Sequence, residues 1–70
     1  MKKIARFRRS AGLTQFELSK SAGVARSKIA NVETGRAVLT DAERQRILKV
    51  LVISIERNLK DLNAELDADG

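Results

Sequence analysis

The segment from Thr14 to Gly35 constrains the fold of this chain most, because it carries start and stop signals for two short helices. Thr14 and Glu17 have the spacing of a capping box, in which the threonine side chain accepts from the first helical turn and the glutamate reaches back. Gly23 supplies the positive φ that a sharp turn requires at little steric cost. The segment therefore predicts two helices joined by a tight turn, with the second beginning at Ala25 or Arg26.

The second of these helices has two unlike faces. Ile29 and Val32, three residues apart, form its buried side. The opposite side carries Arg26, Ser27, Lys28 and Asn31. A helix face with these donors and acceptors matches the hydrogen-bonding groups that base pairs present in the major groove of DNA.

The composition excludes several functional classes. The 70 residues include no Cys and no His, which excludes a thiol nucleophile, a disulfide, a zinc finger and an imidazole base. A helical domain this small offers little concavity for a substrate pocket. We therefore expect no enzymatic activity, metal, cofactor or small-molecule ligand.

The location is expected to be the cytoplasm, in association with the nucleoid. No apolar run approaches the 18 or so residues of a membrane span, and Lys2 and Lys3 precede a charged segment instead of a signal peptide. No effector domain is expected after the helical unit.

The net charge of +5 is distributed unevenly. Residues 1–36 hold nine Lys or Arg against two Glu, a net +7, whereas residues 37–70 hold five against seven acidic residues, a net −2. A basic patch confined to one half attracts phosphates, while the acidic half limits non-specific binding elsewhere on the surface. The asymmetry favours double-stranded DNA as a partner.

The first helix is expected from about Lys2 to Ser10. Ile4, Ala5 and Phe7 or Arg8 should turn inward, and Gly12 should end the helix as a left-handed cap. Leu13 should then enter the core.

Further apolar positions are expected in the core. Phe16, Leu18 and Ala22 give the helix after Thr14 its apolar side, so both aromatics of the chain, Phe7 and Phe16, are expected in the core. The residues from Thr40 to Glu43 form a second capping box, which opens a helix with the apolar stripe Ile47, Leu48 and Leu51.

The C-terminal third permits two interpretations. Ser54 can cap a separate last helix, or one unbroken helix can run through it. A single unbroken helix could present a heptad seam with spacings of 4, 3, 4, 3 and 4 to a partner. Its members are Leu48, Val52, Ile55, Leu59, Leu62 and Leu66.

The seam also predicts how the chain associates. Both forms expose leucines in a monomer, so the expected state is a homodimer. The expected interface residues are Ile55, Leu59, Leu62 and Leu66. The alternatives are that the last helix folds back over its own core, or that the β-branched run from Val50 to Ile55 forms a dimerising strand.

Residues 3 to 55 resemble the lambda Cro/C1 repressor family, the xenobiotic-response-element-like helix-turn-helix regulators. The resemblance lies in Arg8, the run from Gly12 to Gln15, Leu18, Gly23, Val24, Ile29, Val32 and the run from Glu33 to Gly35. Ser19 stands where the family usually has Ala and is still small enough for close helix packing. The resemblance implies an all-α, compact four- to five-helix domain spanning residues 1–70. Its helix-turn-helix would occupy about residues 14–35, and a dimerising segment about residues 52–67.

A recognition helix of this kind enters the major groove with its N-terminal part facing the base edges. Arg26 can make a bidentate contact with guanine, and Asn31 can do the same with adenine. Ser27 discriminates less between bases, and Lys28 suits a phosphate as well as a base. Each of the four can instead be an ordinary solvated side chain.

Phosphate contacts are expected around the recognition helix. Gln15 lies in the first turn of its helix, where the N–H groups and the dipole favour an anion, and the resemblance implies that it clamps the DNA backbone. Thr14, Lys20 and Arg36 are further candidates, with Arg6 and Arg9 weaker. The resemblance also implies a salt bridge between Arg8 and Glu33 that places Arg8 against the DNA backbone; the alternative is two independent solvated charges.

The sequence thus predicts a homodimeric transcriptional regulator, most simply a repressor, that binds an inverted-repeat operator. The alternative is an antitoxin-type interaction protein, whose C-terminal helix binds a partner such as a toxin while the helix-turn-helix only regulates its own operon. RNA is a poorer fit because the A-form major groove is too deep and narrow for such a helix.

Overall fold

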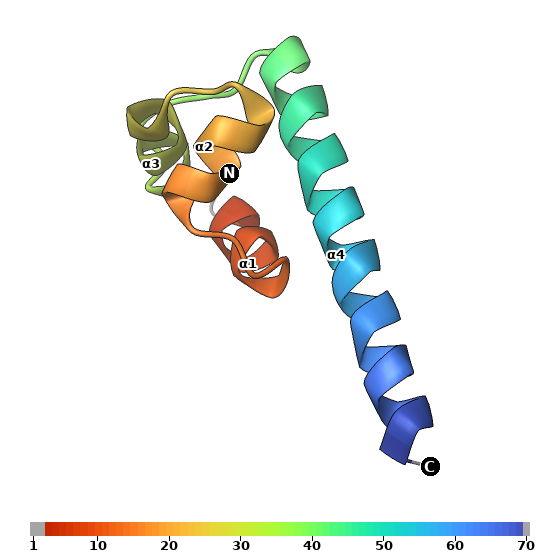
Figure 1. Cartoon of the computed structure of the whole chain (residues 1–70). Helices are drawn as coiled ribbons and strands as arrows, with labels where there is room; N and C mark the ends of the chain where they lie inside the picture. The colour runs from red at the N-terminus through yellow and green to blue at the C-terminus, as the bar shows by residue number, and fades with distance from the viewer. Residues whose placement is uncertain (1–2, 70) are drawn as a thin grey trace.

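The computed structural model describes residues 3–69 and forms four helices in this range, with no strand. They are α1 (Lys3–Ser10), α2 (Gln15–Ala22), α3 (Arg26–Glu33) and α4 (Asp41–Asp69), shown in Figure 1. The all-α expectation is confirmed. The expected start of the first helix at Lys2 lies outside the described residues.

The turn between α2 and α3 is built as its residues predict. The Thr14 hydroxyl accepts from the Glu17 N–H at 3.0 Å, and the Glu17 carboxylate accepts from the Thr14 N–H at 3.0 Å. Gly23 has a φ of 67° and donates its N–H to the Ser19 carbonyl. The Ser19 hydroxyl donates to the Val24 carbonyl at 2.6 Å, so the residue that replaces the family's usual Ala fastens the turn.

α4 is one continuous helix of 29 residues. It starts at a second capping box, in which Thr40 and Glu43 exchange hydrogen bonds of 3.1 and 2.9 Å. Because no Gly or Pro occurs from Asp41 to Asp69, nothing ends the helix at Ser54. The structure thus has the unbroken form, and the alternative of a strand from Val50 to Ile55 is wrong.

The core lies where α1, α2 and α3 meet the first half of α4. Its buried side chains are Ile4, Ala11, Leu18, Ala22, Val24, Ile29, Val32, Ile47 and Leu51. Leu13 packs partly buried against this cluster. The core is therefore small and aliphatic.

Both aromatic residues lie outside this core, contrary to expectation. Phe7 is 49% exposed because α1 turns Ile4 and Arg8 inward, which leaves Phe7 at the side facing α4. Phe16 is 54% exposed, with the Lys20 ammonium 5.3 Å from its ring centre. Leu48 is likewise exposed, although it was expected in the α4 stripe.

Two side chains of α4 fasten it to the other helices. Arg46 donates to the Ala22 carbonyl at 3.0 Å, and Asn58 donates to the Ala11 carbonyl at 3.1 Å. The C-terminal part of α4 projects away from α1, α2 and α3 (Figure 1). The alternative in which the last helix folds back over its own core is therefore wrong.

Candidate nucleic-acid interface

The exposed face of α3 is the centre of the candidate interface. Ile29 and Val32 are fully buried beneath it. Arg26, Ser27 and Asn31 are exposed on the opposite side, as the sequence predicts. The buried pair fixes the rotation of α3 about its own axis, so these three side chains point to solvent together.

Lys28 lies at the edge of this face, beside the start of α4. Its ammonium is 3.4 Å from the Glu43 carboxylate, which also accepts from the Thr40 N–H. The Thr40 backbone hydrogen bond lowers the pKa of Glu43 below its usual value, and the positive charge of Lys28 adds to that shift. Lys28 therefore links α3 to the first turn of α4, and its role as a base contact stays a prediction.

A network of three polar side chains joins the first three helices. Arg8 from α1 meets Glu33 from α3 through Nε at 2.7 Å and Nη2 at 3.2 Å. Gln15 from α2 donates its amide to the same Glu33 carboxylate at 2.9 Å. The Arg8 and Glu33 side chains are only 10% and 8% exposed, so this is a nearly buried, bidentate pair.

The network fixes the charge states of its members. Burial of the Glu33 carboxyl raises its pKa, but the hydrogen bonds from Arg8 and Gln15 outweigh this effect and hold the pKa below the usual value. The hydrogen bond to Glu33 also raises the pKa of Arg8. Both groups are therefore charged at neutral pH, and the end of α3 is tied to α1 and α2.

This arrangement changes the interpretation of Arg8. The resemblance implies an ion pair with Glu33 and a contact with the DNA backbone, and the structure contains the ion pair. The remaining Arg8 nitrogen, Nη1, donates to the Leu13 carbonyl at 2.9 Å, and the residue is 9% exposed. Arg8 thus has a structural role, and its expected phosphate contact stays a prediction.

The other expected phosphate contacts flank α3. Gln15 is half-buried and bonded to Glu33, a contact between residues 18 apart that no local sequence signal reveals. Thr14 is exposed, but its hydroxyl is occupied by the cap. Lys20 and Arg36 are exposed, as are Arg6 and Arg9 on α1.

No group of three or more acidic side chains among the described residues is placed to hold a metal ion. None of the helices in this part of the chain is long and apolar enough to cross a bilayer.

The two short helices, their glycine turn and the exposed polar face of the second define a helix-turn-helix protein. The chain belongs to the helix-turn-helix domain family, whose model matches residues 3–57. This match agrees with the resemblance to the Cro/C1 type and marks the chain as a DNA-binding regulator. The family is typically non-enzymatic. No curated protein and no solved structure matches the chain.

Proposed function

We propose that the protein is a homodimeric repressor that binds an inverted-repeat operator through the major groove. The observation that carries this proposal is the exposed triplet Arg26, Ser27 and Asn31 on α3. The buried pair Arg8 and Glu33 holds the helix that presents the triplet. A fixed recognition helix is what direct reading of base edges requires, because bidentate contacts tolerate little displacement.

Base reading is divided among the exposed side chains. Arg26 is proposed to contact guanine O6 and N7, and Asn31 to contact adenine N6 and N7, each worth about 1–3 kcal/mol of discrimination. Ser27 adds a less selective contact. Lys28 lies at the edge of the face and reaches a base only if its ammonium leaves Glu43.

Phosphate contacts are proposed for the flanks of α3. Gln15 and Thr14 lie at the N-terminus of α2, where backbone N–H groups and the helix dipole favour a phosphate oxygen. Lys20 and Arg36 are exposed and positively charged. These contacts set the position of the protein on DNA and contribute a salt-dependent part of the affinity.

Dimerisation is proposed through the seam of α4. Leu59, Leu62 and Leu66 are 55%, 50% and 60% exposed, and Ile55 precedes them on the same face. Three large apolar side chains in a row on a projecting helix favour a second protein surface over water. A symmetric dimer would present two recognition helices, which is the arrangement that an inverted repeat reads.

The test is selection of duplex DNA from a random pool at about 150 mM salt, where weak charge-driven binding is suppressed. We expect enrichment of an inverted repeat. The variants Arg26→Ala and Asn31→Ala should each relax the selected sequence at one position of each half-site, whereas Arg57→Ala on α4 should not. If no sequence is enriched and binding disappears with salt, the proposal is wrong.

The exposed seam also favours a second candidate, an antitoxin-type protein whose α4 binds a toxin. The same leucines would then contact a different chain. A fixed-ratio complex purified from native cells, with no self-association of the isolated protein, would favour this candidate over the homodimer.

A further inference from the structure

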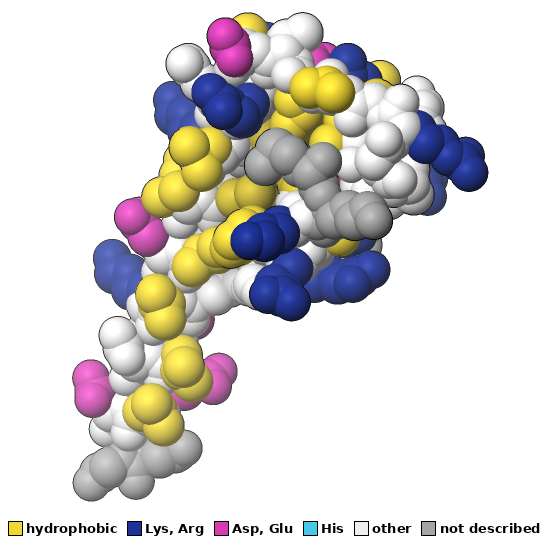
Figure 2. Space-filling view, turned by 180° about the vertical axis from the view of Figure 1, so that it is seen from behind, with side chains coloured by type: hydrophobic (Ala, Val, Ile, Leu, Met, Phe, Trp, Pro, Cys, Tyr) yellow, Lys and Arg dark blue, Asp and Glu magenta, His cyan; other side chains and the backbone are white. Residues whose placement is uncertain are grey.

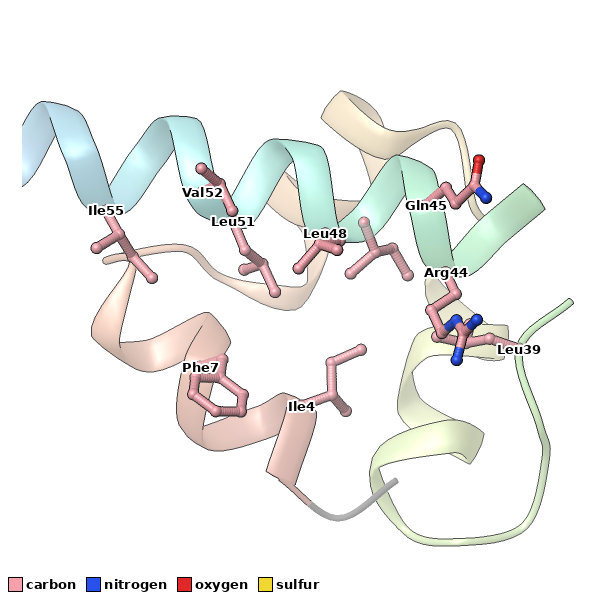
Figure 3. Close-up of a pocket in the computed structure, with 10 residues that line it drawn as sticks. Ile4, Phe7, Leu39, Arg44, Gln45, Leu48, Leu51, Val52 and Ile55 are labelled. Atoms are coloured by element: carbon pink, nitrogen blue, oxygen red, sulfur yellow. The ribbon is translucent and has the colours of Figure 1, made fainter. Parts of the chain in front are cut away.

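An open apolar groove runs between α1 and the first half of α4. Its volume is about 620 Å³. Figure 3 shows Ile4 and Phe7 of α1 on one side of it and Leu51 and Ile55 of α4 on the other. Leu48 and Val52 extend the same wall, and both are exposed.

The groove and the projecting part of α4 form one continuous surface. Figure 2 shows a hydrophobic stripe that runs from the body of the molecule along α4 toward its C-terminal end. In the groove half the seam consists of Leu48, Val52 and Ile55, and in the projecting half of Leu59, Leu62 and Leu66. Three apolar layers in one half are thus matched by three in the other.

The geometry points to an antiparallel dimer, in which the projecting half of α4 from each copy lies in the groove of the other copy. This inference rests on the proposed homodimer and specifies its arrangement. The seam spacings 4, 3, 4, 3 and 4 are the same in both directions, so an antiparallel partner can match every layer. The matched pairs are Leu48 with Leu66, Val52 with Leu62, and Ile55 with Leu59. Any shift by one heptad leaves seam residues unmatched on both copies.

The charges of the two halves favour this direction over a parallel pair. Residues 1–55 hold twelve Lys or Arg against four acidic residues, a net +8, whereas residues 56–70 hold two against five, a net −3. The acidic side chains flank the lower part of the stripe in Figure 2. An antiparallel pair places each acidic end beside the basic body of the partner. A parallel pair places like charges together at both ends, which is unfavourable.

The arrangement also covers what the monomer leaves exposed. Phe7 lies at the wall of the groove, where a partner helix would bury it together with Leu48 and Val52. Contact of each groove with the opposite helix is isologous, so the assembly closes at two copies.

The test uses the absence of native cysteine. We would prepare Val52→Cys and Leu62→Cys as separate proteins, mix them under reducing conditions, and oxidise the mixture. An antiparallel pair should yield the disulfide between positions 52 and 62, identified by mass spectrometry, and Leu62→Cys alone should yield almost none. A parallel pair should yield the 62 to 62 disulfide from the single variant, which would overturn the antiparallel arrangement.

A second measurement leaves the seam intact. Spin labels at Asp67→Cys should be separated by about 30 Å along the helix axis in the antiparallel dimer, because residue 67 lies ten residues from the two-fold axis near residue 57. Labels at Arg57→Cys serve as the control, since they have no axial separation in either direction. A short distance at position 67 would overturn the inference.

These outcomes separate the inference from the proposed function. If the dimer is parallel but still selects an inverted repeat, the repressor proposal stands and only the antiparallel arrangement is wrong. If the protein sediments as a monomer at every concentration, both the homodimer and the antiparallel arrangement are wrong. The DNA selection then still tests the proposed base contacts independently.

Discussion

Glu33 is the residue on which the orientation of α3 depends most. Its carboxylate accepts hydrogen bonds from both Arg8 and Gln15, and its side chain is 8% exposed. We expect Glu33→Ala to lower the free energy of unfolding by about 3 kcal/mol, because the substitution leaves the Arg8 charge nearly buried without its partner. Urea unfolding measures this loss. Asp61→Ala on the exposed surface of α4 is the control, and an equal effect of the two substitutions would contradict the structural role of Glu33.

The Glu33 carboxyl also makes the stability of the fold depend on pH. The folded-state pKa values of Glu33, Glu17 and Glu43 are all lowered, so each group stabilises the fold above its unfolded pKa of about 4.3. That stabilisation is lost as the pH falls through the lower, folded-state values. We expect the melting temperature to be nearly constant from pH 7 to 5 and to fall below about pH 4.5. Glu33→Gln should begin with a lower melting temperature and lose less of it on acidification; an unchanged acid profile would argue against this pair as a contributor.

At the scale of single elements, the helix boundaries were predictable because the signals that set them are local. Thr14 and Glu17, Gly23, and Thr40 and Glu43 each act over a few residues, and all of them form the expected contacts. The position of Phe7 was not predictable, since it depends on the choice of Arg8 as the inward residue of α1. That choice is made by Glu33, 25 residues away.

The features of the candidate site likewise divide into those set by local sequence signals and those set by helix packing. The exposure of Arg26, Ser27 and Asn31 follows from the helical period set by Ile29 and Val32. The attachment of Gln15 to Glu33 and of Lys28 to Glu43 depends on how the helices pack against one another. No pattern within a single helix contains that information.

The contact between Lys28 and Glu43 connects the recognition helix to α4. Because the Glu43 carboxylate holds the Lys28 ammonium at 3.4 Å, we expect Glu43→Gln to release it toward the DNA. Affinity for operator and for unrelated duplex should then rise together, with a steeper salt dependence, as a new phosphate contact predicts. Fluorescence anisotropy at several salt concentrations measures both. The double variant with Lys28→Met is the control and should return the salt slope to the original value; a Glu43→Gln slope equal to that of the unaltered protein would contradict the idea.

For the molecule as a whole, the length of α4 determines how far apart two recognition helices lie. The Lys28 contact with Glu43 places α3 level with residue 43, which is 14 residues from the proposed two-fold axis near residue 57. At 1.5 Å per residue, the two α3 helices of an antiparallel dimer are about 40 Å apart along α4, near the spacing of about 34 Å for one turn of DNA. A parallel dimer would place both at the same level.

The operator should therefore have half-sites about one helical turn apart on the same face of the duplex. Insertion of five base pairs between them turns one half-site to the opposite face, and we expect it to reduce binding to the level of a single half-site. Insertion of ten base pairs returns the half-site to the original face but lengthens the spacing by another turn. Because α4 is fixed in the groove of the partner copy, the dimer cannot span this longer spacing. Gel-shift titration of the three operators tests this prediction. A rigid dimer should bind only the original operator tightly, whereas two recognition units that act independently would bind all three alike.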